Sequence, residues 1–273
     1  MKGFGAILAA ELRDLVRAPL FWLGAAGTVA AAFGFGRRAP ASANGWVAYE
    51  SAVRASGLAA TFFLLGLSAV SVAGERARGT VRWVLPRPVS RAAFVLGKGA
   101  AIAIAAFFLL ALSSLTSLAV AGPRGFGDVA VDAGSFEFVD EIPVDPEFAA
   151  PAMRGRAIQT TLVLFPALLT AAGLGLVVSC LSRSGGAAVI VALAVAVPLH
   201  LAPAILGLSR DVARLLPFGA ADEFLSRLRD FGMAMSSEKW PRYGAAGLAA
   251  GAMGAIGLPL LGAAFFSRLD VTD

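Results

Sequence analysis

The sequence has few of the residues on which protein chemistry usually depends. Its single cysteine, Cys180, excludes a disulfide within the chain and a metal site built on two cysteines, so we expect a small apolar packing residue there. With one histidine, His200, the chain has no His-Glu-x-x-His motif. Gly-x-Ser-x-Gly and the Gly-x4-Gly-Lys-Ser/Thr loop that binds ATP are absent as well. These absences argue against an enzyme, and we expect the chain to bind no cofactor or metal of its own.

Charged residues are also scarce, and apolar residues take their place. Of 273 residues, 15% are charged and 58% hydrophobic, with a mean hydropathy of +0.77; soluble domains carry roughly 25% charged and 45–50% apolar residues. Six charge-free windows match the run of about 20 apolar residues that spans a bilayer: Ala18–Gly36, Ala55–Gly74, Gly99–Pro123, Ala157–Ser182, Ser184–Ser209 and Tyr243–Ser267. Their number argues against the alternative, buried helices of a large soluble core. The sequence therefore predicts an all-α integral membrane protein with six transmembrane helices in a single domain, residues 1–273.

We expect no cleavable signal peptide in the N-terminal segment, residues 1–17, because charges interrupt its short apolar run. Apolar residues recur at three- and four-residue spacing on one face: Phe4, Ile7, Leu8, Leu12, Leu15 and Val16. This pattern predicts a helix lying on the membrane interface, with Pro19 marking the turn into the first span. A frayed polar leader is the alternative.

Lysine and arginine are distributed unequally between the segments that connect the windows. One group of segments holds 11 basic residues in 48 positions, and the other holds 12 in 84. The first group is 1–17, 75–98, 183 and 268–273; the second is 37–54, 124–156 and 210–242. Because basic residues concentrate on the cytoplasmic side, we expect both termini and residues 75–98 in the cytoplasm. The net charge of +5 then reflects topology and not nucleic-acid binding.

Two of the outer segments have a distinct character. Residues 124–156 carry seven acidic residues and an alternating "SFEFVDEI" stretch that predicts a short extended segment. They lack the loop motif of a calcium site, so a solvated or partner-facing outer loop is favoured. Residues 210–242 place Phe224, Leu225, Leu228 and Phe231 at helical spacing, which predicts one or two amphipathic helices at the outer interface.

Two features lie within the windows. His200 is an ionisable residue inside the fifth window, which makes it a candidate functional site, although no second ionisable residue occurs in any other window. The alternative is a neutral histidine bonded to a backbone carbonyl. In the sixth window the spacing of Gly247, Gly251 and Gly254 favours close helix packing.

The most charged short stretch is "GERARGTVRWVLPRPVSRAAFVLGK", Gly74–Lys98, between the second and third windows. We expect Glu75 to end the second span and Arg76, Arg78 and Arg82 to lie on a short cytoplasmic helix. Pro86 and Pro88 disfavour helix at the residues before them, and Ser90 is a good N-cap for a helix that begins at Arg91. The sequence therefore predicts a stiff elbow between the two spans.

This stretch resembles the signature of ABC-2 type permeases, the membrane-spanning subunits of ATP-binding cassette transporters. The matching residues are Glu75, Gly79, Thr80, Leu85, Pro88, Val89, Ser90, Arg91, Gly97 and Lys98. "ELRDLVRAP" near the N-terminus resembles the interfacial helix of that family, and the predicted layout of spans is similar too. The acidic segment 124–156 is longer than the usual family pattern, so the resemblance implies nothing about it.

The resemblance implies a permease in the bacterial cytoplasmic membrane that works as a homodimer or with a close paralogue. Two copies of a separate ATPase would bind ATP and magnesium. The helix around Arg76–Leu85 would be the coupling helix, and Glu75 and Arg78 would form ion pairs at that joint. The cargo stays open: lipids, peptides and drugs are alternatives, as is force transmission to a periplasmic partner at residues 124–156. An ion-coupled carrier that uses His200 and needs no ATPase is the competing hypothesis.

Overall fold

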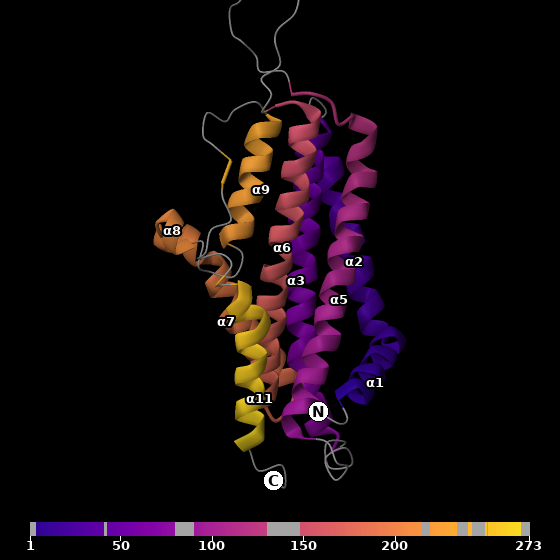
Figure 1. Cartoon of the computed structure of the whole chain (residues 1–273), viewed down its shortest axis with the longest axis vertical. Helices are drawn as coiled ribbons and strands as arrows, with labels where there is room; N and C mark the ends of the chain where they lie inside the picture. Colours follow the sequence, from indigo (N-terminus) through magenta and orange to yellow (C-terminus); the bar gives the residue numbers. More distant parts are fainter. Residues whose placement is uncertain are drawn as a thin grey trace, which may run out of the picture.

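The computed structural model describes residues 4–40, 43–79, 90–129, 148–213, 219–233, 240–241, 249 and 251–268 (Figure 1). Within this part of the chain the regular elements are all helical. In chain order they are α1 (Phe4–Arg17), α2 (Pro19–Arg38), α3 (Gly45–Ala77), α5 (Arg91–Ala121), η1 (Gly122–Arg124), α6 (Ala150–Leu181), α7 (Gly185–Leu206), α8 (Arg210–Ala213), α9 (Gly219–Gly232), the π-helical turn η2 (Met253–Gly257) and α11 (Leu258–Arg268).

Five of the described helices are long and apolar enough to cross a membrane: Pro19–Arg38, Gly45–Ala77, Arg91–Arg124, Ala150–Leu181 and Gly185–Pro203. The prediction of an all-α, multi-pass membrane protein is confirmed at this level. The sixth window is described only in part, and Met253–Arg268 forms a shorter apolar helix, so the sixth span stays a prediction. The start of α1 and the end of α11 lie at the same end of the bundle (Figure 1).

Several predicted helix boundaries are confirmed. Ser90 caps α5, since its hydroxyl accepts a hydrogen bond from the Ala93 amide at 3.1 Å. Residues 4–17 form the expected N-terminal helix, and Pro19 opens α2. The short Ser182–Ser184 connection makes α6 and α7 neighbours in space, as expected.

The second predicted span was too short. It was expected to cover Ala55–Gly74, but α3 runs for 33 residues and begins ten residues earlier, at Gly45. Asn44 caps it by accepting a hydrogen bond from the Val47 amide at 3.2 Å. The helix continues through Glu50 and Arg54 because these two charges pair with each other, with the Arg54 Nε 2.5 Å from the Glu50 carboxylate.

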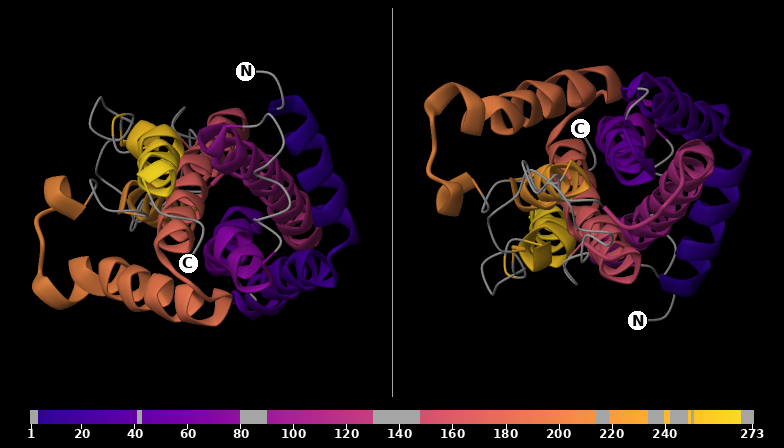
Figure 2. Two further views of the ribbon diagram at one scale, coloured as in Figure 1. Left: turned by 90° about the horizontal axis from the view of Figure 1, so that it is seen from below. Right: turned by 90° about the horizontal axis from the view of Figure 1, so that it is seen from above.

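Helix α3 is the centre of the bundle. It packs against α2, α5, α6, α7 and α9, and small residues let the helices approach closely. At Gly175 of α6, an added Cβ would lie 2.5 Å from the Leu65 carbonyl oxygen of α3. The hydroxyls of Ser56 in α3 and Ser113 in α5 lie 2.5 Å apart in the interior. Helix α7 diverges from this core toward α8 in both end views (Figure 2).

Helix α9 confirms the amphipathic helix expected within 210–242. Its apolar residues, Phe224, Leu225, Leu228 and Phe231, are buried. They pack against α3 and α6, and α9 stands beside α6 (Figure 1). The apolar face that was expected to meet the outer membrane interface therefore meets protein.

Candidate functional site

A buried lysine joins three helices near the end of the bundle where α1 begins, called the Lys98 end below. Lys98 is 2% exposed in the second turn of α5. Its Nζ lies 2.5 Å from Glu11 Oε1 of α1 and 2.5 Å from Glu75 Oε1 in the last turn of α3. The ammonium also lies 5.0 Å from the centre of the Phe94 ring. Together Glu11, Lys98 and Glu75 form the Lys98 cluster, which fastens the N-terminal helix to α3 and α5.

The charges of the Lys98 cluster do not balance, since two carboxylates meet one ammonium. Burial raises the pKa of Glu11 above its ordinary 4.5, and the opposing attraction of Lys98 is the smaller effect. A lysine this deep in protein needs ionic partners because desolvation of its charge is costly. The cluster therefore depends on all three side chains being present.

A cavity of about 350 Å³ lies beside the Lys98 cluster. Its charged lining comes from Glu11, Asp14, Glu75, Arg78 and Lys98, and its apolar lining includes Leu67 and Val70. Asp14 and Arg78 are exposed at its rim. The cavity thus combines a charged end with an apolar wall.

Arg76 has a different position from the one expected. It was predicted on a separate short helix, but it belongs to the last turn of α3, which ends at Ala77. Its guanidinium donates to the carbonyl oxygens of Cys180 and Ser182, both at 3.2 Å. These carbonyls belong to the C-terminal end of α6, where the helix dipole favours a positive charge. Arg76 therefore ties the end of α3 to the end of α6.

The other residues of the predicted elbow fall into two groups. Gly79 adopts a positive φ of 70° just after α3, and Arg91, the first residue of α5, donates to the Ser267 carbonyl of α11 at 3.4 Å. The remaining predicted residues lie outside the described part of the chain: Thr80, Arg82, Leu85, Pro86 and Pro88.

The extended segment expected within 124–156 also lies outside the described part of the chain, which includes only the two ends of this range. Within those ends, the carboxylate of Asp128 accepts from the Ala150 amide at 2.6 Å, at the start of α6.

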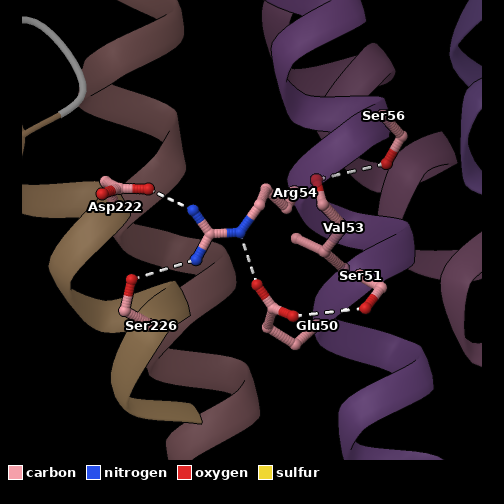
Figure 3. Close-up of polar contacts among 7 residues, drawn as sticks. All are labelled: Glu50, Ser51, Val53, Arg54, Ser56, Asp222 and Ser226. Atoms are coloured by element: carbon pink, nitrogen blue, oxygen red, sulfur yellow. Dashed lines mark hydrogen bonds and ion pairs between the residues drawn. The ribbon is translucent and has the colours of Figure 1, made fainter. Parts of the chain in front are cut away.

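A second charged cluster, drawn in Figure 3, lies toward the start of α3, opposite the Lys98 end. The Arg54 guanidinium binds the Glu50 carboxylate at 2.5 Å, forms an ion pair with Asp222 of α9, and donates to the Ser226 hydroxyl at 3.1 Å. Glu50 is 1% exposed. Sequence reasoning missed this cluster because it assigned residue 54 to an outer loop; the spacing of Glu50 and Arg54 by four residues was the available signal.

His200 lies near this second cluster. Its ring packs edge-on to Phe62 at 6.4 Å between centres. It also lines a cavity of about 120 Å³ together with Arg54 and Asp222. The expectation that no second ionisable residue occurs in another span was wrong, because α3 begins at Gly45 and therefore includes Glu50 and Arg54.

Of the three glycines expected in close packing, Gly251 and Gly254 are described and Gly247 is not. At Gly254 a Cβ would collide with the side chain of Thr170 in α6. This glycine therefore serves packing within the chain.

The Lys98 cluster and the second cluster are thus two sites where charge is held inside the helical bundle. The sequence matches no protein-family model and no curated protein sequence.

Proposed function

We propose that the chain is the membrane-spanning subunit of an ABC transporter and that a separate ATPase drives it. The Lys98 end would face the cytoplasm, and a second permease copy would complete the transporter. Glu75, Arg76 and the segment that follows them would receive the ATPase. The motif in Gly74–Lys98 motivates the proposal, and the contacts at the two ends of this segment support it.

The observation that carries the proposal is how firmly the two helix ends that flank residues 80–89 are held. On the α3 side, Glu75 binds Lys98 and Arg76 binds the end of α6. On the α5 side, Arg91 binds the end of α11. Since Lys98 also binds Glu11 of α1, a force applied between α3 and α5 would reach three further helices, α1, α6 and α11. This is the mechanical arrangement that a coupling element needs.

The test is purification of the full-length chain from its native membrane, followed by measurement of ATP hydrolysis in the same chromatographic peak. Because the chain has no ATP-binding loop of its own, hydrolysis there belongs to a partner. We expect a stoichiometric ATPase subunit, and we expect its loss when residues 80–85 are replaced by a Gly/Ser linker. This replacement spares Arg76, which the fold needs.

The matched control is the same length of Gly/Ser linker at residues 132–137, in the connection at the opposite end of the bundle. It should retain the ATPase. Retention of the ATPase by the 80–85 variant would refute the coupling assignment, and a wild-type peak without any ATPase would refute the whole proposal.

One observation favours a second candidate, an ion-coupled carrier. His200, Arg54 and Asp222 line one cavity, and such carriers need ionisable groups within the bundle. In proteoliposomes with a pH-sensitive dye inside, a potassium diffusion potential should then drive proton uptake that His200→Ala abolishes. Equal uptake rates for the wild type and His200→Ala would remove this candidate.

A further inference from the structure

The cavity beside the Lys98 cluster lies at the depth of lipid headgroups. Along α3, Arg54 and Glu75 mark the two charged ends of the apolar stretch, and they are separated by about 31 Å of helix. This length matches the roughly 30 Å hydrocarbon thickness of a bilayer. With α3 across the membrane, Glu75 and the cavity rim are therefore level with the headgroups.

The cavity lining on α3, α5 and α1 changes from apolar to charged in the same direction, and Leu20 of α2 adds to the apolar part. On α3 the lining runs from Leu67 and Val70 to Glu75 and Arg78, over about 16 Å. On α5 it runs from Ile102 to Lys98, and on α1 from Leu15 to Glu11. A ligand with one polar end and one apolar end matches this gradient, and a cavity of about 350 Å³ is within the usual range for ligand sites.

The charges in the cavity lining indicate which polar group the ligand carries. Three carboxylates, Glu11, Asp14 and Glu75, face two cations, Arg78 and Lys98, so the lining carries a formal charge of −1. Lys98 is already engaged by Glu11 and Glu75. This leaves Asp14 and Arg78 at the exposed rim, one of each sign. A zwitterion with a hydrogen-bonding ammonium suits this rim better than an anion does.

We propose that this cavity binds one phospholipid with an ethanolamine headgroup. The phosphate pairs with Arg78, the ammonium pairs with Asp14, and the first acyl carbons lie against Leu67, Val70 and Leu20. The lipid holds α1 against α3 and α5 beside the Lys98 cluster. The inference requires only that the chain lies in a membrane, so it does not depend on an ATPase partner.

Native mass spectrometry of the purified full-length chain, titrated with defined lipids, tests the proposal. Phosphatidylethanolamine should bind most tightly. Phosphatidylcholine should bind more weakly because its quaternary ammonium cannot donate hydrogen bonds, and anionic phosphatidylglycerol should bind weakest. Asp14→Asn and Arg78→Gln should each weaken ethanolamine lipid binding about two- to fivefold, as expected for pairs at an exposed rim. Asp14→Lys changes the lining to +1 and should reverse the preference toward phosphatidylglycerol.

The control variants remove equal charges elsewhere. Arg183→Gln lies at the exposed α6–α7 connection and Asp230→Asn lies on α9, and neither should alter lipid affinity. Soluble glycerophosphoethanolamine should fail to displace the lipid, because it lacks the apolar part that the cavity wall contacts. Equal affinity for all three lipids, full displacement by the soluble headgroup, or equal effects of the rim and control variants would overturn the proposal.

Discussion

Replacement of Lys98 by methionine is the sharpest test of the Lys98 cluster. The substitution keeps much of the apolar stem but removes the ammonium from Glu11 and Glu75. Breaking a buried ion pair costs about 3–5 kcal/mol of unfolding free energy. The two carboxylates are 22% and 27% exposed, so water screens part of their repulsion. We therefore expect the unfolding free energy to fall by about 3 kcal/mol. That corresponds to a melting temperature lower by about 6–10 °C.

The loss of stability in Lys98→Met should depend on pH. Burial raises the pKa of Glu11, and Lys98 lowers it again in part, so Lys98→Met should raise this pKa further. A carboxyl whose folded pKa is raised stabilises the fold below its unfolded pKa, here near 4.5, and that stability is lost as pH rises through the folded pKa. The difference in melting temperature from the wild type should therefore be smaller at pH 5 than at pH 8.

The assay is thermal unfolding in detergent micelles, followed by tryptophan fluorescence and by the monodisperse fraction. The triple variant Lys98→Met, Glu11→Gln and Glu75→Gln removes all three charges and should recover most of the loss, since apolar or neutral replacement of a buried ionic group is often tolerated. Arg183→Met serves as an exposed control. A melting temperature unchanged in Lys98→Met, or no recovery in the triple variant, would refute the reasoning.

Two further predictions concern the interior. Gly175→Ala should lower stability by about 1–3 kcal/mol through overpacking against α3. At Gly66 a Cβ meets nothing within 4 Å, so Gly66→Ala should be neutral or stabilising by up to about 1 kcal/mol. The melting temperatures of the two variants test this difference. Arg54→Met leaves Glu50 buried without its cation and should cost about 3 kcal/mol, with faster hydrogen exchange in α9. Asp222→Asn at its exposed end should cost under about 1 kcal/mol, and equal effects of the two variants would contradict this account.

The sequence predicts the membrane class and most helix positions because run length and caps act locally. Ser90 and Pro19 mark helix starts through their own side-chain chemistry, and the structure agrees. Windows without charge locate the apolar middle of each span, which is why α2, α5, α6 and α7 were recognised.

The errors come from charges that the fold neutralises. Arg54 was assigned to an outer loop. Lys98 was expected on the helix that begins at Arg91, but outside the third window, because a sequence window ends wherever a charge appears. Both are held within helices by carboxylates distant in the chain, Glu11 and Glu75 for Lys98 and Asp222 for Arg54. Only Glu50, four residues before Arg54, was a local signal. Long-range pairing of this kind cannot be inferred from the spacing of residues in one chain.

The length of α3 has a mechanical consequence. Its 33 residues form a rod of about 50 Å, while the hydrocarbon layer occupies only about 30 Å of it. The surplus lies mainly at Gly45–Arg54, where α9 is attached through Arg54. Such a rod works as a lever with its fulcrum in the membrane: a tilt of about 5° moves one end relative to the other by about 4 Å. A small displacement imposed at Glu75 would thus produce a larger displacement at the surface that α9 and the start of α6 form on the opposite side, because the arm of the rod toward Gly45 is the longer one.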